Sequence, residues 1–124
     1  MNSKVSMVVR ILLGLILLVF GINKFANFMP AMEMPEAAGA FFGAMMATGF
    51  LIPLIAVVEI VVGAMLLLNK WVPFALVALF PITVGFILFH LALAPAGIGA
   101  AALVAILHLI LLYNYRESFK GLFV

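Results

Sequence analysis

The sequence predicts an all-α membrane protein, a bundle of four transmembrane helices. Of its 124 residues, 69% are apolar and only 8% are charged, and the mean hydropathy is +1.47. A soluble domain is about 45–50% apolar and about 25% charged, so this chain lacks the polar residues that would cover a surface in water. The lipid bilayer is therefore the expected surrounding of most of the chain.

Four apolar stretches are long enough to cross a bilayer, which takes roughly 20 apolar residues. Polar residues or Pro and Gly separate them, and we expect one domain, residues 1–124. The expected spans are residues 5–25, 50–68, 72–93 and 98–114. The first apolar run is not followed by small residues of the kind found at a signal cleavage site, so we expect it to be retained as a helix.

The one long connection, residues 26–49, lies between the first two spans. Its second half, residues 35–48, opens with Pro35 and Glu36, both suited to a helix N-terminus. A short helix lying in the membrane interface is the favoured interpretation, and a loop packed on the mouth of the bundle is the alternative.

Basic residues near the span ends predict the orientation. One side would carry five of them, Lys4, Arg10, Lys70, Arg116 and Lys120, and the other only Lys24, beside two glutamates of the long connection. We therefore expect both termini to be cytoplasmic, in a bacterial or archaeal plasma membrane.

Three ionisable residues lie well inside the expected spans: Arg10, Glu59 and His108. Each costs about 2.5–3.5 kcal/mol on insertion scales and is expected to face the bundle interior, so we predict one intramembrane polar cluster. An Arg10–Glu59 ion pair fits the reach of arginine, and Glu59–His108 is a competing or additional pairing. Asn23, Lys24 and His90 are expected to form a polar layer at the outer end.

Glycines alternate with two of these cations on the first span. Arg10, Gly14, Leu17, Gly21 and Lys24 follow steps of four, three, four and three, which place them on one face of a helix. Gly63 occupies a similar small-residue face of the second span. Gly14, Gly21 and Gly63 are therefore predicted to let neighbouring helices approach closely.

The chemistry of these residues remains open between two interpretations. Arg10 and Glu59 fit a structural ion pair as well as ligand or proton handling, whereas a hydrogen-bonded bundle histidine is favoured for His108 and an interfacial residue for His90. The chain has no cysteine, which excludes thiol chemistry within it. There is no basic stripe for nucleic acid, and no metal site is expected.

Several segments carry a family resemblance. "RILLGLILLVFGINKF" (10–25), "TGFLIPLIAVVEIVVGAMLLL" (48–68), "FHLALAPAGI" (89–98) and "YNYRESF" (113–119) together resemble the DoxX family of small membrane proteins. The positions matching that family's polar-and-glycine pattern are Arg10, Gly14, Gly21, Lys24, Glu59 and Gly63. Some members are similar to membrane subunits of thiosulfate:quinone oxidoreductases, so the resemblance implies quinone as a ligand class but no catalytic residue.

Two functions follow as hypotheses. The first is a membrane subunit or accessory protein of a redox or quinone-linked process, not an enzyme on its own, whose partner is a redox enzyme or another membrane protein. The alternative is a non-enzymatic scaffold or assembly factor in which the buried charges are structural. A small transporter ranks last, because no inverted halves are visible. Glycine stripes also suit a homo-oligomer.

Overall fold

The computed structural model describes residues 3–29 and 33–124, and every regular element in these ranges is helical. Four helices are long and apolar enough to span a membrane, which confirms the predicted all-α membrane fold. They are α1 (Ser3–Ala26), α3 (Leu51–Leu68), α4 (Val72–Ala92) and α5 (Ile98–Asn114), the last preceded by the short 3-10 turn η1 (Pro95–Gly97). Their bounds lie within two residues of those expected from the hydropathy.

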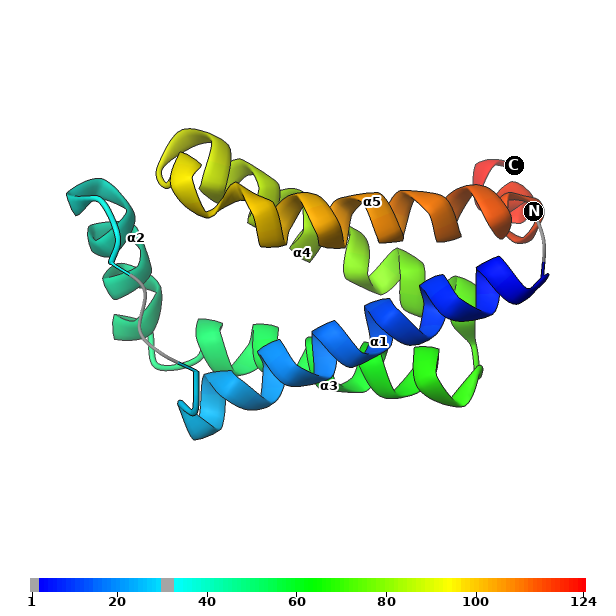
Figure 1. Cartoon of the computed structure of the whole chain (residues 1–124), viewed down its shortest axis with the longest axis horizontal. Helices are drawn as coiled ribbons and strands as arrows, with labels where there is room; N and C mark the ends of the chain where they lie inside the picture. Colours follow the sequence, from blue (N-terminus) through cyan, green and yellow to red (C-terminus); the bar gives the residue numbers. More distant parts are fainter. Residues whose placement is uncertain (1–2, 30–32) are drawn as a thin grey trace.

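The four long helices run alternately up and down (Figure 1). Both termini lie at one end of the bundle, here called the terminal end, and helix α2 (Glu36–Ala47) lies at the other, here called the α2 end. Contacts follow a ring in the order α1, α3, α4, α5 and back to α1, and the most extensive packing is that of α1 on α3. The α1–α3 pair and the α4–α5 pair diverge toward the α2 end (Figure 1).

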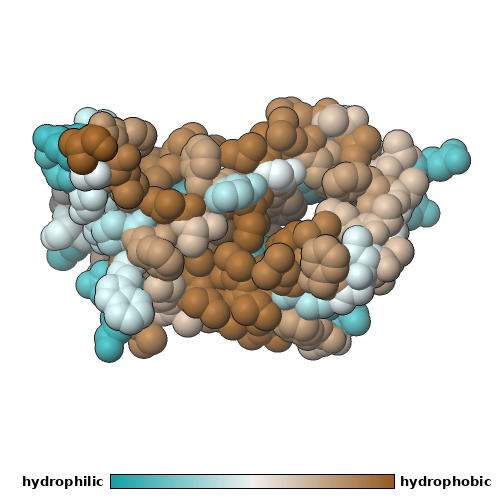
Figure 2. Space-filling model, turned by 180° about the vertical axis from the view of Figure 1, so that it is seen from behind, coloured by the Kyte–Doolittle hydropathy of each residue, from teal (hydrophilic) through white to brown (hydrophobic). Residues whose placement is uncertain are grey.

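The bundle is apolar both inside and outside. Its largest fully buried aliphatic side chains come from all four long helices: Leu13, Leu17, Leu66, Leu76, Leu79 and Leu111. On the face shown in Figure 2, apolar residues cover most of the middle and hydrophilic residues gather toward the two ends. A helix that is apolar on every side suits a hydrocarbon surrounding, so the surface agrees with a protein that crosses a membrane.

Glycines bring α1 and α3 into backbone contact. A Cβ added at Gly63 would lie 2.8 Å from the carbonyl oxygen of Gly14, and one added at Gly14 would lie 3.0 Å from that of Gly63. Farther along the same contact, a Cβ at Gly21 would lie 3.0 Å from the carbonyl oxygen of Ala56. The three glycines predicted to allow close approach, Gly14, Gly21 and Gly63, thus lie where the two backbones meet. Only a residue without a side chain fits at such a contact.

Helix α2 forms in the second half of the long connection, as the sequence suggested. It begins directly after Pro35 and runs across the direction of the other helices at the α2 end (Figure 1). Ala38 is its buried residue, and the Phe41 ring lies 5.9 Å from that of Phe89 in α4. Its location at the membrane interface remains a prediction.

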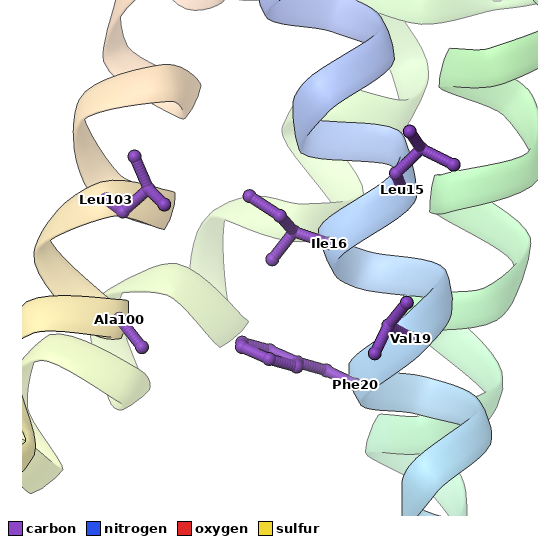
Figure 3. A pocket seen from close by; sticks show the side chains of 6 residues that line it. All are labelled: Leu15, Ile16, Val19, Phe20, Ala100 and Leu103. Carbon is purple, nitrogen blue, oxygen red and sulfur yellow. The ribbon is translucent and has the colours of Figure 1, made fainter.

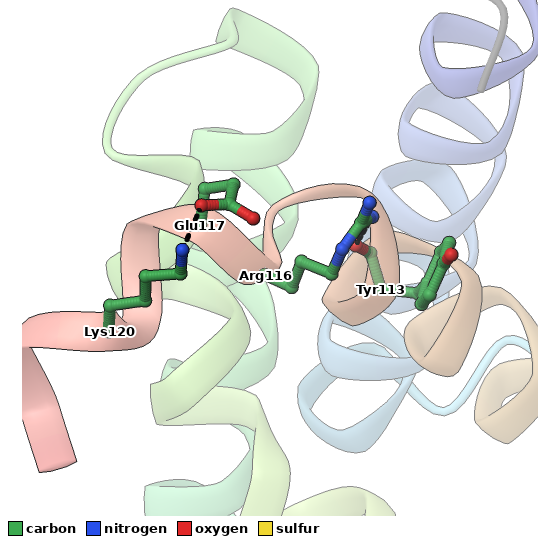
Figure 4. Close-up of polar contacts among 4 residues, drawn as sticks. All are labelled: Tyr113, Arg116, Glu117 and Lys120. Atoms are coloured by element: carbon green, nitrogen blue, oxygen red, sulfur yellow. Dashed lines mark hydrogen bonds and ion pairs between the residues drawn. The ribbon is translucent and has the colours of Figure 1, made fainter.

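The chain ends in a short exposed helix, η2 (Arg116–Phe123), at the terminal end. The guanidinium of Arg116 lies 4.2 Å from the centre of the Tyr113 ring and donates to the Tyr113 carbonyl oxygen at 2.9 Å. Lys120 Nζ lies 2.6 Å from Glu117 Oε2 (Figure 4). Both partners of this ion pair are exposed, so it contributes little to stability.

The glycine contact yields a stability prediction. Gly63→Ala should lower the free energy of unfolding by about 1–3 kcal/mol, because the added methyl group meets the Gly14 backbone and must push the helices apart. Gly85→Ala in α4 is the matched control, since a Cβ there meets nothing within 4 Å, and alanine favours a helix over glycine by up to about 1 kcal/mol. Thermal unfolding in mild detergent measures the stability of both variants. Equal effects of Gly63→Ala and Gly85→Ala would contradict the role of Gly63 in the packing of α1 on α3.

Candidate functional site

Arg10 caps the end of a neighbouring helix. Its side chain is buried in α1, and Nη1 donates a hydrogen bond to the carbonyl oxygen of Leu66. Leu66 belongs to the last turn of α3, where the carbonyl groups carry the negative end of the helix dipole; its oxygen also accepts from the Asn69 amide, just past the helix, at 3.3 Å. The cation is therefore held by the C-terminus of α3.

The expected Arg10–Glu59 ion pair is not formed, and this prediction was wrong. The contact of Gly14 with Gly63 sets the register of the two antiparallel helices and places Arg10 level with Leu66. Glu59 lies seven residues earlier on α3, which corresponds to about 10 Å along the axis. The Arg10 guanidinium therefore lies closer to the C-terminus of α3 than to the Glu59 carboxylate, and it bonds there.

Glu59 pairs instead with Lys24, which the sequence had placed in a separate outer layer. Lys24 Nζ lies 2.7 Å from Glu59 Oε1, and the exposed fractions of the two side chains are 24% and 6%. Gly21 makes this approach possible, since a Cβ there would lie 3.2 Å from Glu59 Cβ. The buried Oε1 has no other partner among the described residues. Lys24–Glu59 is therefore a largely buried ion pair between the last turn of α1 and the middle of α3.

His108 forms hydrogen bonds through both ring nitrogens. Nε2 lies 2.9 Å from the Leu76 carbonyl oxygen and Nδ1 lies 2.8 Å from Thr83 Oγ1, both on α4. A carbonyl only accepts, so Nε2 carries the proton, and the neutral ring accepts from the Thr83 hydroxyl at Nδ1. The competing Glu59–His108 pairing is not formed. His108 joins α5 to α4, and the predicted cluster of Arg10, Glu59 and His108 separates into three different contacts.

The other two members of the expected outer layer serve the local backbone. Asn23 Oδ1 accepts from the Met29 amide at 2.8 Å, and the amide of Asn27 bonds the Asn23 carbonyl, so Asn23 helps to end α1. His90 Nδ1 lies 3.1 Å from the Ala94 carbonyl oxygen. Among residues 3–29 and 33–124, no three histidine or acidic side chains lie together as a set of metal ligands.

Two polar contacts between helices were not predicted from the sequence. Asn114 Nδ2 donates to Ser6 Oγ at 2.7 Å and joins α5 to α1 at the terminal end. Thr83 Oγ1 in α4 bonds His108 in α5, 25 residues away in the sequence. Both pairs join polar residues at matching depths of different spans. Depth is visible in the sequence, whereas the choice of neighbouring helix is not.

An apolar groove opens sideways between α1 and α5. Its volume is about 240 Å³, and its lining residues are Leu15, Ile16, Val19, Phe20, Ala100 and Leu103. Figure 3 shows Ile16 and Phe20 of α1 pointing across the gap toward α5, which carries Ala100 and Leu103. The lining is apolar throughout, and three of its side chains, including Leu103, are more than 40% exposed. Phe20 precedes Lys24 by one helical turn, so the groove and the ion pair share one stretch of α1. The six lining residues were not singled out in the sequence, because each is an ordinary apolar residue of a span.

These features define a small integral membrane protein in which four apolar spans are joined by glycine contacts and buried polar bonds. The family model DoxX matches residues 5–92, and the chain belongs to the DoxX family. The match runs from α1 through α4 and ends before α5. No curated protein and no solved structure matches the chain.

The buried ion pair leads to an asymmetric mutational prediction. Lys24→Met should destabilise the protein more than Glu59→Gln does. Without Lys24 the carboxylate of Glu59, 6% exposed, is left unpaired in the bundle, whereas a lysine without Glu59 can extend its long side chain toward the surface. The double variant should recover about 1–3 kcal/mol relative to the sum of the single changes, measured as unfolding free energies in detergent.

The matched control is the exposed pair at the C-terminal end. Lys120→Met and Glu117→Gln, alone and together, should show a coupling below about 1 kcal/mol, because both side chains are solvated. Equal coupling in the two cycles, or a larger effect of Glu59→Gln than of Lys24→Met, would contradict the burial of Glu59.

Proposed function

We propose that the protein is a membrane subunit or accessory protein of a redox or quinone-linked process, and that it holds a lipophilic ligand in the groove between α1 and α5. The observation that carries this proposal is the groove itself, about 240 Å³ in volume and lined by six apolar side chains. It opens toward the face that would meet lipid, so a ligand could enter from the bilayer without crossing water.

The size and lining of the groove select the kind of ligand. Sites for whole drug-sized molecules measure about 300–1,000 Å³, so this groove suits one ring or a length of chain while the remainder of the molecule stays in lipid. Isoprenoid quinones have this form, a small ring on a long apolar tail. Phe20 supplies an aromatic surface for such a ring.

Lys24 and Glu59 provide polar groups beside this apolar site. Lys24 follows Phe20 on α1 by one helical turn, and Glu59 Oε1 has no partner other than Lys24 among the described residues. A lipid-soluble molecule with an oxygen-bearing ring would find both a donor and an acceptor at this depth. The protein contains no thiol, so we assign it ligand holding and the electron-transfer chemistry to a partner redox enzyme.

A scaffold or assembly factor is the second candidate, and a specific observation favours it. Arg10 and His108 use their hydrogen-bonding groups in contacts between helices, with Leu66 and with Thr83 and Leu76. Such contacts hold a bundle together without any ligand. The two functions differ in whether a lipophilic molecule stays with the purified protein.

Extraction of bound quinone tests the proposal. Protein purified from its membrane in mild detergent should carry quinone detectable by chromatography and mass spectrometry, and Ala100→Phe should reduce its amount at least about tenfold by filling the groove. Ile106→Phe is the matched control, because Ile106 is an exposed residue of the same helix outside the groove lining. Folded protein that carries no quinone, or equal amounts in both variants, would favour the scaffold.

We also propose that both termini face the cytoplasm, supported by the excess of basic residues at the terminal end. Because the chain has no cysteine, single-cysteine variants report orientation directly. Ala37→Cys in α2 should react with a membrane-impermeant maleimide on intact cells, and Ser118→Cys in η2 only after permeabilisation; both positions are exposed. The reverse pattern of labelling would invert the topology.

A further inference from the structure

A short turn joins α3 to α4 at the terminal end (Figure 1). Helix α3 has 18 residues, about 27 Å at 1.5 Å per residue, and the hydrocarbon core of a bilayer is about 30 Å thick. The two ends of α3 therefore lie at the borders of that core. Lys70 and Trp71 stand between its end at Leu68 and the start of α4 at Val72, so they are held in the headgroup layer.

Trp71 has an unusual backbone conformation for a large residue. Its φ is +50°, in the left-handed region, where the Cβ atom of a bulky residue crowds its own backbone. Glycine takes this conformation without strain, so the turn itself does not call for a tryptophan. Trp71 is also 77% exposed. What the tryptophan adds is an exposed aromatic surface, and residues held in strained conformations gather at binding sites.

The exposed ring is part of a shallow apolar hollow, lined by Trp71, Pro73 and Phe74. From the hollow toward the middle of the span, exposed apolar residues follow one face of α4 in steps of three and four: Phe74, Val77, Pro81 and Val84. This face runs in the direction of a lipid acyl chain, and the indole ring of tryptophan prefers the headgroup layer. The hollow therefore fits the glycerol region of one lipid, with a chain lying along α4.

The charge around this hollow selects the headgroup. Lys70 is exposed and forms no ion pair with another described residue. Arg116 and Lys120 lie at the same end of the bundle, and Glu117, which is paired with Lys120, is the acidic residue there. The acidic segment 33–36 lies at the α2 end instead. An anionic headgroup thus finds opposite charge at the terminal end.

We propose that the α3–α4 turn binds an anionic phospholipid, with its phosphate at Lys70 and its glycerol region against Trp71 and Phe74. The site shares no lining residue with the groove between α1 and α5 and does not depend on the ligand proposed for that groove. A lipid held there differs from the surrounding lipid, because the lysine and the hollow engage the headgroup and the glycerol region of the same molecule.

Quenching of tryptophan fluorescence tests this site, because Trp71 is the only tryptophan of the chain. The intact chain is placed in nanodiscs of one fixed mixture of phosphatidylcholine and phosphatidylglycerol. Bromine, which quenches tryptophan at short range, is carried on the acyl chains of one lipid or of an equal amount of the other. The headgroup composition is then identical, so a difference in quenching reports which lipid adjoins the ring. We expect phosphatidylglycerol to associate about fivefold more strongly, the preference that one lysine gives at an anionic membrane surface.

Two lysine variants locate the preference. Lys70→Gln should abolish it while both lipids still quench Trp71, because the ring stays at the membrane. Lys120→Gln is the matched control: it removes the same charge from the same end, but Lys120 is paired with Glu117 and lies outside the hollow, so the preference should persist. Both lysines are exposed, and neither change should disturb the fold.

Three results would overturn the lipid site. The first is equal quenching of the wild-type protein by the two lipids, or quenching by neither, which would place the ring outside the bilayer. The second is an equal loss of preference in Lys70→Gln and Lys120→Gln, which would assign it to the overall charge of this end. The third is a loss of preference in inorganic phosphate but not in potassium chloride of equal ionic strength, which would identify a free anion as the ligand. The wild-type comparison uses no variant and no quinone, so its result is independent of the groove.

Discussion

The close contact of α1 with α3 at Gly14 and Gly63 sets the positions of the other polar groups. Two backbones that touch through residues without side chains have a single register, because sliding either helix brings a side chain into the gap. That register places Arg10 at the last turn of α3 and lets the long Lys24 side chain reach Glu59. A change at either glycine would therefore disturb both polar contacts as well as the packing.

The two ends of the bundle differ in how the helices are held together. Toward the terminal end, Arg10 and Asn114 bond to other helices, and the midspan His108 bonds α4 through both ring nitrogens. The helix pairs diverge toward the α2 end (Figure 1), and Glu59, halfway along α3, has Lys24 as its one partner among the described residues. The groove between α1 and α5 lies toward this end.

This difference follows from the solvent. Lipid tails are as apolar as leucine, so burial of apolar side chains does not by itself press helices together in a membrane. Close glycine contacts and polar bonds hold the pairs where they occur, and apolar helices can stay apart where they do not. An open apolar groove such as that beside Phe20 is costly in water but not in lipid, and it can be retained for a ligand.

The sequence by itself determined the class of protein, the four spans, the helix after Pro35 and the glycine face of α1, because hydropathy and helical spacing are local properties of one segment. It also indicated the depth of each polar residue. The partners were decided only by the tertiary structure: Lys24 rather than Arg10 for Glu59, and Thr83 and Leu76 rather than Glu59 for His108. Several polar residues of different spans share similar depths, and which of them meet depends on the register and rotation of whole helices. Those are set by backbone contacts between segments far apart in the chain, which no local pattern reports.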